Sequence, residues 1–165
     1  MGILDDRNNL RLQTSLKFKD APLCTKCPAR LYQKTDDVVR YGKGNMIPEY
    51  MFVLPKHAII CDVYEELLNE VCKDIVNVEE QYITYHEKCI SNADAKKHCV
   101  QYLFHEIRKI NPKKIIFFGI DIPEQLCTDK HNAFVFKLYD LYSIIHDKKN
   151  KDIIRNKLKE ILWYI

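Results

Sequence analysis

The order of hydrophobic and polar positions predicts strands that alternate with helices after residue 50. Short apolar or β-rich runs typical of buried strands occur at residues 51–54, 81–85, 114–118 and 133–138. Apolar positions at helical spacing predict helices at residues 63–76, 93–110 and 153–162, with a short helix at IPEQL. This alternation predicts an α/β fold, a three-layer sandwich in which helices cover both faces of a central four-stranded parallel sheet.

The length and composition predict a single domain. The 165 residues suit one hydrophobic core, and 47% hydrophobic with 30% charged residues excludes a disordered or fibrous chain. We expect residues 1–49 to form a polar, loop-rich arm and residues 50–165 to form the α/β core. The segment YGKGN, from Tyr41 to Asn45, holds two of the four glycines and marks a turn near the end of the arm.

The hydropathy of the chain bears on membrane association, whereas its net charge does not identify a partner. The net charge of +3 permits contact with an anionic partner without requiring one. No apolar run approaches the roughly 18 residues that span a bilayer, and the first residues lack the pattern of a secretory signal. We therefore expect no membrane association and a cytoplasmic location.

Seven cysteines without an export signal favour thiol, metal or catalytic chemistry over a disulfide framework. Cys24 and Cys27, in CTKC, can turn both sulfurs toward one ion. Cys89 follows the second predicted strand and Cys99 lies early in the next helix, so four thiolates could close a tetrahedral site. Such a set accepts zinc or a [4Fe–4S] cluster, and the alternative is thiols that bind no metal. The other three cysteines are expected to act as small buried hydrophobic residues: Cys61, Cys72 and Cys127.

Four segments follow one another in an order that a known family shares. They are LCTKCPARL, then VVRYGKGN before the strand YMFVLP, then YITYHEKC, and finally CVQYLFHEIRKINPKKIIFFG. From about Leu23 to the C-terminus, the chain resembles the iron–sulfur uracil-DNA glycosylases, small α/β proteins with a four-stranded parallel sheet. The resemblance implies that a [4Fe–4S] cluster, or alternatively zinc, is held by Cys24, Cys27, Cys89 and Cys99.

The segments that correspond to the active site of that family differ from its pattern. After the first strand the family has a glycine-rich loop with acidic residues, whereas LPKHAIICDVYEELL retains only Pro55. The family reads uracil with an Asn after Y-I-T, but Tyr85 stands there, and a phenol cannot reproduce an amide. Near the place of the His that stabilises the leaving base, this chain has Tyr139 or Asp140. An anionic Asp would oppose the charge that develops on the base.

These departures imply a pseudoenzyme with impaired glycosylase activity. If the chain instead hydrolyses the N-glycosidic bond of uracil, the candidate catalytic residues are His57, Asp62 and Asp140. Each could lie at a strand end and move protons. The alternative for each is an exposed polar residue in a loop.

Basic residues with neighbouring tyrosines in the arm are typical of nucleic-acid contact. The candidates are Arg30, Lys34, Arg40 and Lys43, flanked by Tyr32 and Tyr41. Such a set suits single-stranded DNA or contact with the phosphate backbone. The tyrosines could equally be ordinary core and rim residues.

The expected function is that of a catalytically impaired, uracil-DNA-glycosylase-like iron–sulfur protein. It would bind nucleic acid as a subunit of a DNA replication or repair complex, with a DNA polymerase or another replication protein as partner. The content of Lys, Ile and Asn suits an AT-rich viral, phage or bacterial genome, and a viral protein would act in the host cytoplasm. Two alternatives stay open: an active uracil-DNA glycosylase with relocated catalytic residues, and a protein-interaction module stapled by a metal.

Overall fold

The computed structural model describes residues 41–56, 63–88, 96–128 and 131–164. In chain order its strands are β1 (Lys43–Gly44), β2 (Tyr50–Lys56), β3 (Tyr82–Glu87), β4 (Lys114–Phe118) and β5 (Phe134–Leu138). The helices are α2 (Val63–Cys72), the 3-10 helix η2 (Val78–Glu80), α3 (Lys96–Ile110), α4 (Glu124–Thr128), α5 (Ser143–His146) and α6 (Lys149–Trp163).

The strands form one sheet in the order β1-β3-β2-β4-β5. Strand β2 pairs in parallel with β3 and β4, and β4 pairs in parallel with β5. Strand β1 pairs antiparallel with β3, Lys43 opposite Ile83. The predicted α/β fold is confirmed, but the sheet is mixed and has five strands in the described part of the chain. The sequence did not indicate β1, because a two-residue strand is too short for an alternating pattern.

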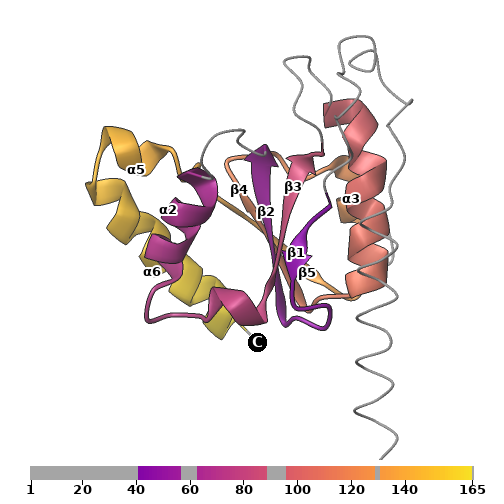
Figure 1. Cartoon of the computed structure of the whole chain (residues 1–165), viewed down its shortest axis with the longest axis horizontal. Coiled ribbons are helices and arrows are strands. Elements are labelled where there is room, and N and C mark those ends of the chain that lie inside the picture. Colours follow the sequence, from indigo (N-terminus) through magenta and orange to yellow (C-terminus); the bar gives the residue numbers. More distant parts are fainter. Residues whose placement is uncertain (1–40, 57–62, 89–95, 129–130, 165) are drawn as a thin grey trace, which may run out of the picture.

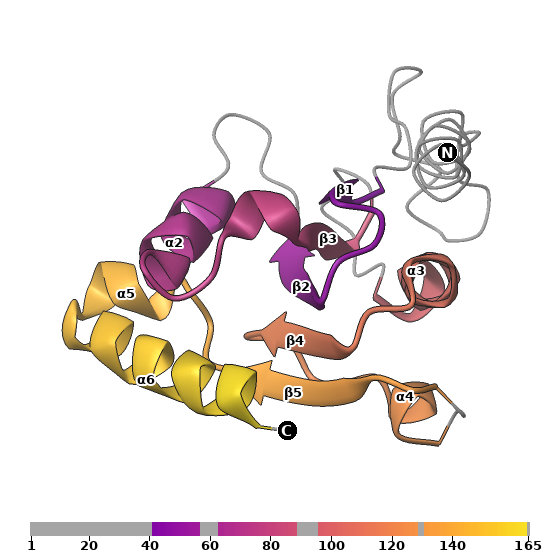
Figure 2. The ribbon, with the colours of Figure 1, turned by 90° about the horizontal axis from the view of Figure 1, so that it is seen from below.

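Helices lie on both faces of the sheet (Figure 2): α2, α5 and α6 on one, α3 and α4 on the other. Strand β2 shows how alternating residues of one strand supply apolar side chains to both faces of the sheet. Met51 and Val53 join the hydrophobic cluster with α3, and Phe52 and Leu54 join the cluster with α2 and α6. All four side chains are fully buried, which explains why β2 is an uninterrupted apolar run.

Helix α2 ends at Cys72, four residues before the predicted end. The chain turns because Asp74 adopts the left-handed conformation, with φ of 62°. The guanidinium Nη1 of Arg155 on α6 then donates to the last carbonyls of the helix and the turn, those of Glu70, Val71 and Lys73, at 2.8–3.1 Å. This cap joins the end of α2 to α6.

Helix α3 ends at Ile110, as predicted from the following Asn111 and Pro112. Asn111 has φ of 50° and donates its backbone N–H to the carbonyl of Ile107 at 2.8 Å. Pro112 has no N–H to continue the helix. Strand β4 follows at Lys114 and coincides with the predicted segment.

Candidate functional site

The sheet topology points to the carboxyl ends of its parallel strands as the place for a ligand. The chain leaves β2 toward α2 on one face and leaves the adjacent strand β4 toward α4 on the other. Open α/β sheets bind ligands outside the carboxyl ends of strands at such a reversal. These ends lie at the upper edge of the sheet in Figure 1.

Asp140 lies directly against the end of β4. Gly119, the residue after β4, has φ of 69°, and a Cβ atom added there would come within 2.6 Å of the Cβ of Asp140. The carboxylate Oδ1 of Asp140 accepts the backbone N–H of Tyr142 at 3.0 Å, which fixes the turn before α5. Asp140 therefore shapes this end of the sheet, and only a glycine fits beside it.

A phenol shares the environment of Asp140. Burial, with a further contribution from the negative charge of Asp140, raises the pKa of Tyr64 to about 12. The rings of Tyr64 and Tyr142 pack with centroids 5.0 Å apart. This corner thus holds a carboxylate and two tyrosines.

Beside β3, one carboxylate joins three elements. The Tyr85 hydroxyl donates to Oε1 of Glu65 on α2, and Nζ of Lys43 on β1 lies 2.5 Å from Oε2 of the same carboxylate. Tyr85 is 2% exposed, whereas the side chain of Lys43 is 64% exposed. Glu65 therefore bonds to both residues, to the buried Tyr85 and to the largely exposed Lys43.

On the opposite face of β3, Glu106 of α3 is fully buried and accepts hydrogen bonds from β3, from Lys88 directly after it and from Gly42 before β1. Its Oε1 accepts from the backbone N–H of Gly42 at 2.6 Å, the Tyr82 hydroxyl at 2.9 Å and the Thr84 hydroxyl at 2.9 Å. Its Oε2 accepts from Thr84 at 2.8 Å and from the Lys88 ammonium. We refer to Gly42, Tyr82, Thr84, Lys88 and Glu106 as the Glu106 network.

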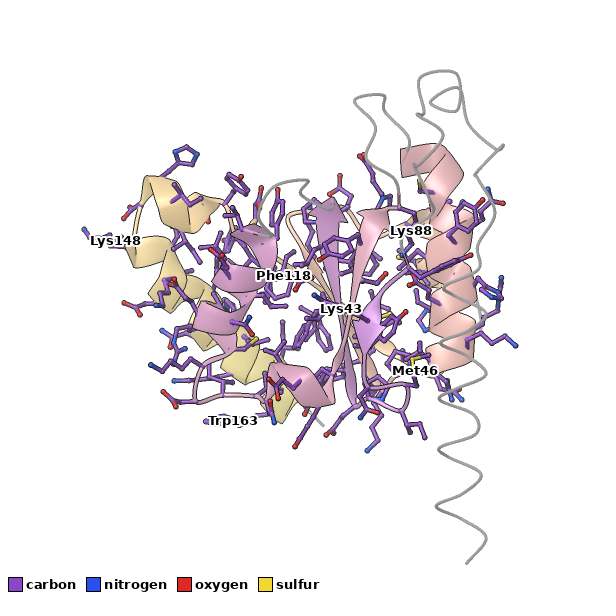
Figure 3. The ribbon with its side chains drawn as sticks, viewed as in Figure 1. Lys43, Met46, Lys88, Phe118, Lys148 and Trp163 are labelled. Atoms are coloured by element: carbon purple, nitrogen blue, oxygen red, sulfur yellow. The ribbon has the colours of Figure 1, made fainter. Side chains whose placement is uncertain are left out.

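Lys88 is the cation of this network, at the end of β3 on the side that α3 covers (Figure 3). Its side chain is 1% exposed, and Nζ also donates to the Thr84 hydroxyl at 2.5 Å. Burial lowers the pKa of Lys88, while the charges of Glu106 and Cys99 oppose that shift. Cys99, itself buried on α3, contributes the smallest of these effects.

The structure places one predicted residue, Asp140, at this edge, at the end of β4. Lys43 lies opposite Ile83, near the start of β3, and Cys99 is buried in the first part of α3. The remaining predicted site residues lie outside the described ranges: Cys24, Cys27, Arg30, Lys34, Arg40, His57, Asp62 and Cys89. Within the described ranges, no group of three His, Cys, Asp or Glu side chains is arranged to hold a metal ion.

One expectation about the other cysteines is wrong. Cys72 is fully buried in the core, as expected, but Cys127 is exposed. The five-residue helix α4 turns Leu126 toward the core and leaves its neighbour Cys127 toward solvent. Cys61 lies outside the described residues.

Sequence reasoning missed the Glu106 network. A signal was present, because Glu106 stands among the buried positions Cys99, Leu103, Ile107 and Ile110 at helical spacing. A carboxylate at such a position must find partners in the interior.

The fold is that of an α/β protein whose sheet has the strand order at which open α/β sheets bind ligands. No protein-family model matches the sequence, and a search of curated proteins finds no match either. In the described ranges, none of the helices has the length and apolar character needed to cross a membrane.

Proposed function

We propose that this chain is a uracil-DNA-glycosylase-like protein that binds DNA and lacks glycosylase activity. Its four parallel strands would correspond to the central sheet of that family's three-layer sandwich. The proposal also draws on the four ordered sequence segments, LCTKCPARL to CVQYLFHEIRKINPKKIIFFG. It would act in the cytoplasm, or in the host cytoplasm if the chain is viral, as part of a replication or repair complex.

One observation supports the proposed loss of activity. The hydroxyl of Tyr85 is bound to Glu65, and the Tyr85 side chain is 2% exposed. By the resemblance, Tyr85 stands where the family's uracil-reading Asn would be. A phenol whose hydroxyl is held by an internal carboxylate cannot offer the donor and acceptor that a uracil edge requires. A base flipped into this place would meet a filled site.

We further propose a metal centre held by four cysteines, as a [4Fe–4S] cluster with zinc as the alternative. Its ligands would be Cys24, Cys27, Cys89 and Cys99. Cys99 is buried on α3, and the positive charge of Lys88 acts on it in the direction that favours the thiolate. When bound, the group would tie the arm to the core.

Uracil release tests the catalytic part of the proposal. Wild-type protein, purified anaerobically, is incubated with a labelled single strand that contains one uracil, beside an active glycosylase as positive control. We expect no release above that of protein-free buffer. Release that Asp140→Asn abolishes would overturn the proposal in favour of an active enzyme with relocated catalytic residues.

A salt titration tests the DNA-binding part. We expect single-stranded DNA to bind with an affinity that falls steeply with salt, by a slope of about −0.7 per phosphate contact. Lys43→Ala should weaken binding and make the slope shallower by about one contact. The control is Lys157→Ala, an exposed lysine on α6 that pairs with Glu160. Absence of salt-dependent binding would overturn the proposal and favour a protein-interaction module.

A further inference from the structure

The two edges of the sheet differ in length and chemistry. Strand β1 closes one edge with two exposed residues, one of them Lys43. Strand β5 forms the other edge with five residues, FVFKL, which include neither proline nor glycine. In the described ranges no strand pairs with its outer side (Figure 2). Proteins commonly protect sheet edges with short strands, prolines or charges, because an open edge pairs with further strands. β1 has such protection, and β5 is the edge suited to pairing.

The backbone of β5 directs alternate residues toward its open side. The N–H of Phe134 donates to the carbonyl directly before β4 at 2.9 Å, and the carbonyl of Leu138 accepts from the N–H directly after β4 at 3.0 Å. In a parallel ladder every second residue bonds to the same neighbouring strand, so Phe136 also faces β4. Val135 and Lys137, which lie between these residues, therefore direct their N–H and C=O groups outward.

Exposed aromatic side chains accompany this edge. The ring of Tyr164, at the end of α6, packs edge-on against Phe134 and Phe136, with centroids 5.8 and 6.0 Å apart. Phe134 is 51% exposed, Tyr164 56%, and Tyr139, directly after β5, 64%. At about 150–250 Å² for each aromatic side chain, the exposed parts of these three amount to about 350 Å². This is nearly half of the about 800 Å² that each partner buries in a stable interface. The backbone of β5 and the adjacent side of α6 would supply the rest.

The lysines of this edge have carboxylate partners in their own chain. The Lys137 ammonium on β5 pairs with Asp121, and the Lys157 ammonium on α6 lies 2.9 Å from a carboxylate oxygen of Glu160. Paired charges of this kind offer little attraction to a phosphate backbone and cause little repulsion between two copies of the same surface. The edge therefore suits another polypeptide better than a nucleic acid.

The strand is complementary to itself in one antiparallel register. When a two-fold axis passes through Phe136, Val135 of each copy stands opposite Lys137 of the other, and each such pair can exchange both of its main-chain hydrogen bonds. The two Phe136 residues then form a non-hydrogen-bonded pair, in which side chains are closest. A register centred on Lys137 would instead place two ammonium groups opposite each other, which is unfavourable.

We infer that β5 is a dimer interface. The β5 strands of two copies pair antiparallel about Phe136 and join the two sheets into one continuous sheet. A second copy is the partner because this register satisfies the outward backbone groups, buries the exposed rings and keeps the lysines apart. The inference goes beyond the proposed function, since it depends on neither DNA binding nor a metal centre.

Sedimentation equilibrium of the full chain tests the interface. We expect the wild type to reach a mass of twice 19.6 kDa as its concentration rises through the micromolar range. Val135→Pro removes an outward N–H that β4 does not use, so the sheet should persist while the dissociation constant rises by about tenfold or more. The control is Ile145→Ser, which removes an apolar side chain of similar exposure, 55%, from α5. Its dissociation constant should equal that of the wild type.

Disulfide cross-linking tests the register. In Phe136→Cys the two introduced cysteines would stand opposite each other with Cα atoms about 4.5 Å apart, within the range that a disulfide spans. In Lys137→Cys each cysteine would stand opposite Val135 and two residues away from its counterpart, beyond that range. After mild oxidation, non-reducing electrophoresis should show a cross-linked dimer for Phe136→Cys alone, above the background that the seven native cysteines give in the wild type.

Two results would overturn the inference. A wild type that stays monomeric at every concentration has no such interface, and its edge would be left for a strand of another protein. A dimer that Val135→Pro leaves intact, without a cross-link in Phe136→Cys, would be held by another surface. If Val135→Pro does not fold, the comparison of Phe136→Cys with Lys137→Cys still decides. Each of these results leaves the proposed function as it stands.

Discussion

The ammonium of Lys88 and the carboxylate of Glu106 form an ion pair in the interior, with 1% and 0% of their side chains exposed. Burial of two charges is costly, and their attraction offsets that cost only when both are present and further hydrogen bonds are made. Here Thr84 bonds to both partners. The pair therefore stabilises the fold only when both charges are present, because either charge alone would be buried without its counter-ion.

A double-mutant cycle on this pair should show strong coupling. Lys88→Met and Glu106→Leu, made singly, should each lower the free energy of unfolding by about 3–5 kcal/mol, because each leaves one buried charge unpaired. The double variant should lose less than the sum, because it leaves no unpaired charge. Denaturant unfolding of the four proteins gives the coupling free energy, and additive losses would contradict a buried pair.

The elements of the fold were largely predictable, but their polar partners were not. Strand β4 matches its predicted bounds because KIIFF is an uninterrupted apolar run ended by Gly119. Glu106 could be recognised as a charge at a core position, yet its partners are 18, 22, 24 and 64 residues away in the sequence. Periodicity reports which face of an element is buried and carries no information on which distant segment packs there.

Lys114 should contribute more to stability than its neighbour Lys113. The Lys114 ammonium donates to the carbonyls of Ile161, Leu162 and Tyr164 at 3.0, 3.0 and 2.6 Å, which satisfies the C-terminal end of α6. Hydrogen bonds with a charged partner contribute about 1.5–3 kcal/mol, so Lys114→Met should lower the free energy of unfolding by at least that amount.

Lys113→Met is the matched control for this change. The Lys113 side chain is 77% exposed and lies 3.8 Å from Glu49, an arrangement that contributes about 0–1 kcal/mol. Denaturant unfolding compares the two variants. Equal losses would show that the bonds at the end of α6 do not stabilise the fold.

The phenol of Tyr64 should lose its proton at a higher pH than an ordinary tyrosine. Burial and the charge of Asp140 raise its pKa to about 12, from an ordinary value of 10. Between pH 10 and 12 the unfolded chain loses this proton while the folded chain keeps it, so stability falls as pH rises through that window. Below pH 10 the contribution is complete.

Ultraviolet titration of tyrosinate absorption tests this assignment. Tyr64→Phe should remove one late-titrating phenol, and Asp140→Asn should move the same transition to lower pH because it removes the negative charge. Tyr139→Phe, at an exposed position, serves as the control variant. An unchanged late phase in Tyr64→Phe would contradict the assignment.

Two cysteines of the described core should differ sharply in reactivity. Burial raises the pKa of the Cys72 thiol to about 12, and the side chain is fully buried, so both thiolate content and access are low. Cys127 is exposed on α4. In native protein at pH 8, Cys127→Ser should remove one rapidly reacting thiol from a titration with Ellman's reagent. Cys72→Ser should leave the rapid count unchanged, and in denaturant each variant should show one thiol fewer than the wild type. A rapid thiol lost with Cys72→Ser would mean that the core around α2 opens on the timescale of the reaction.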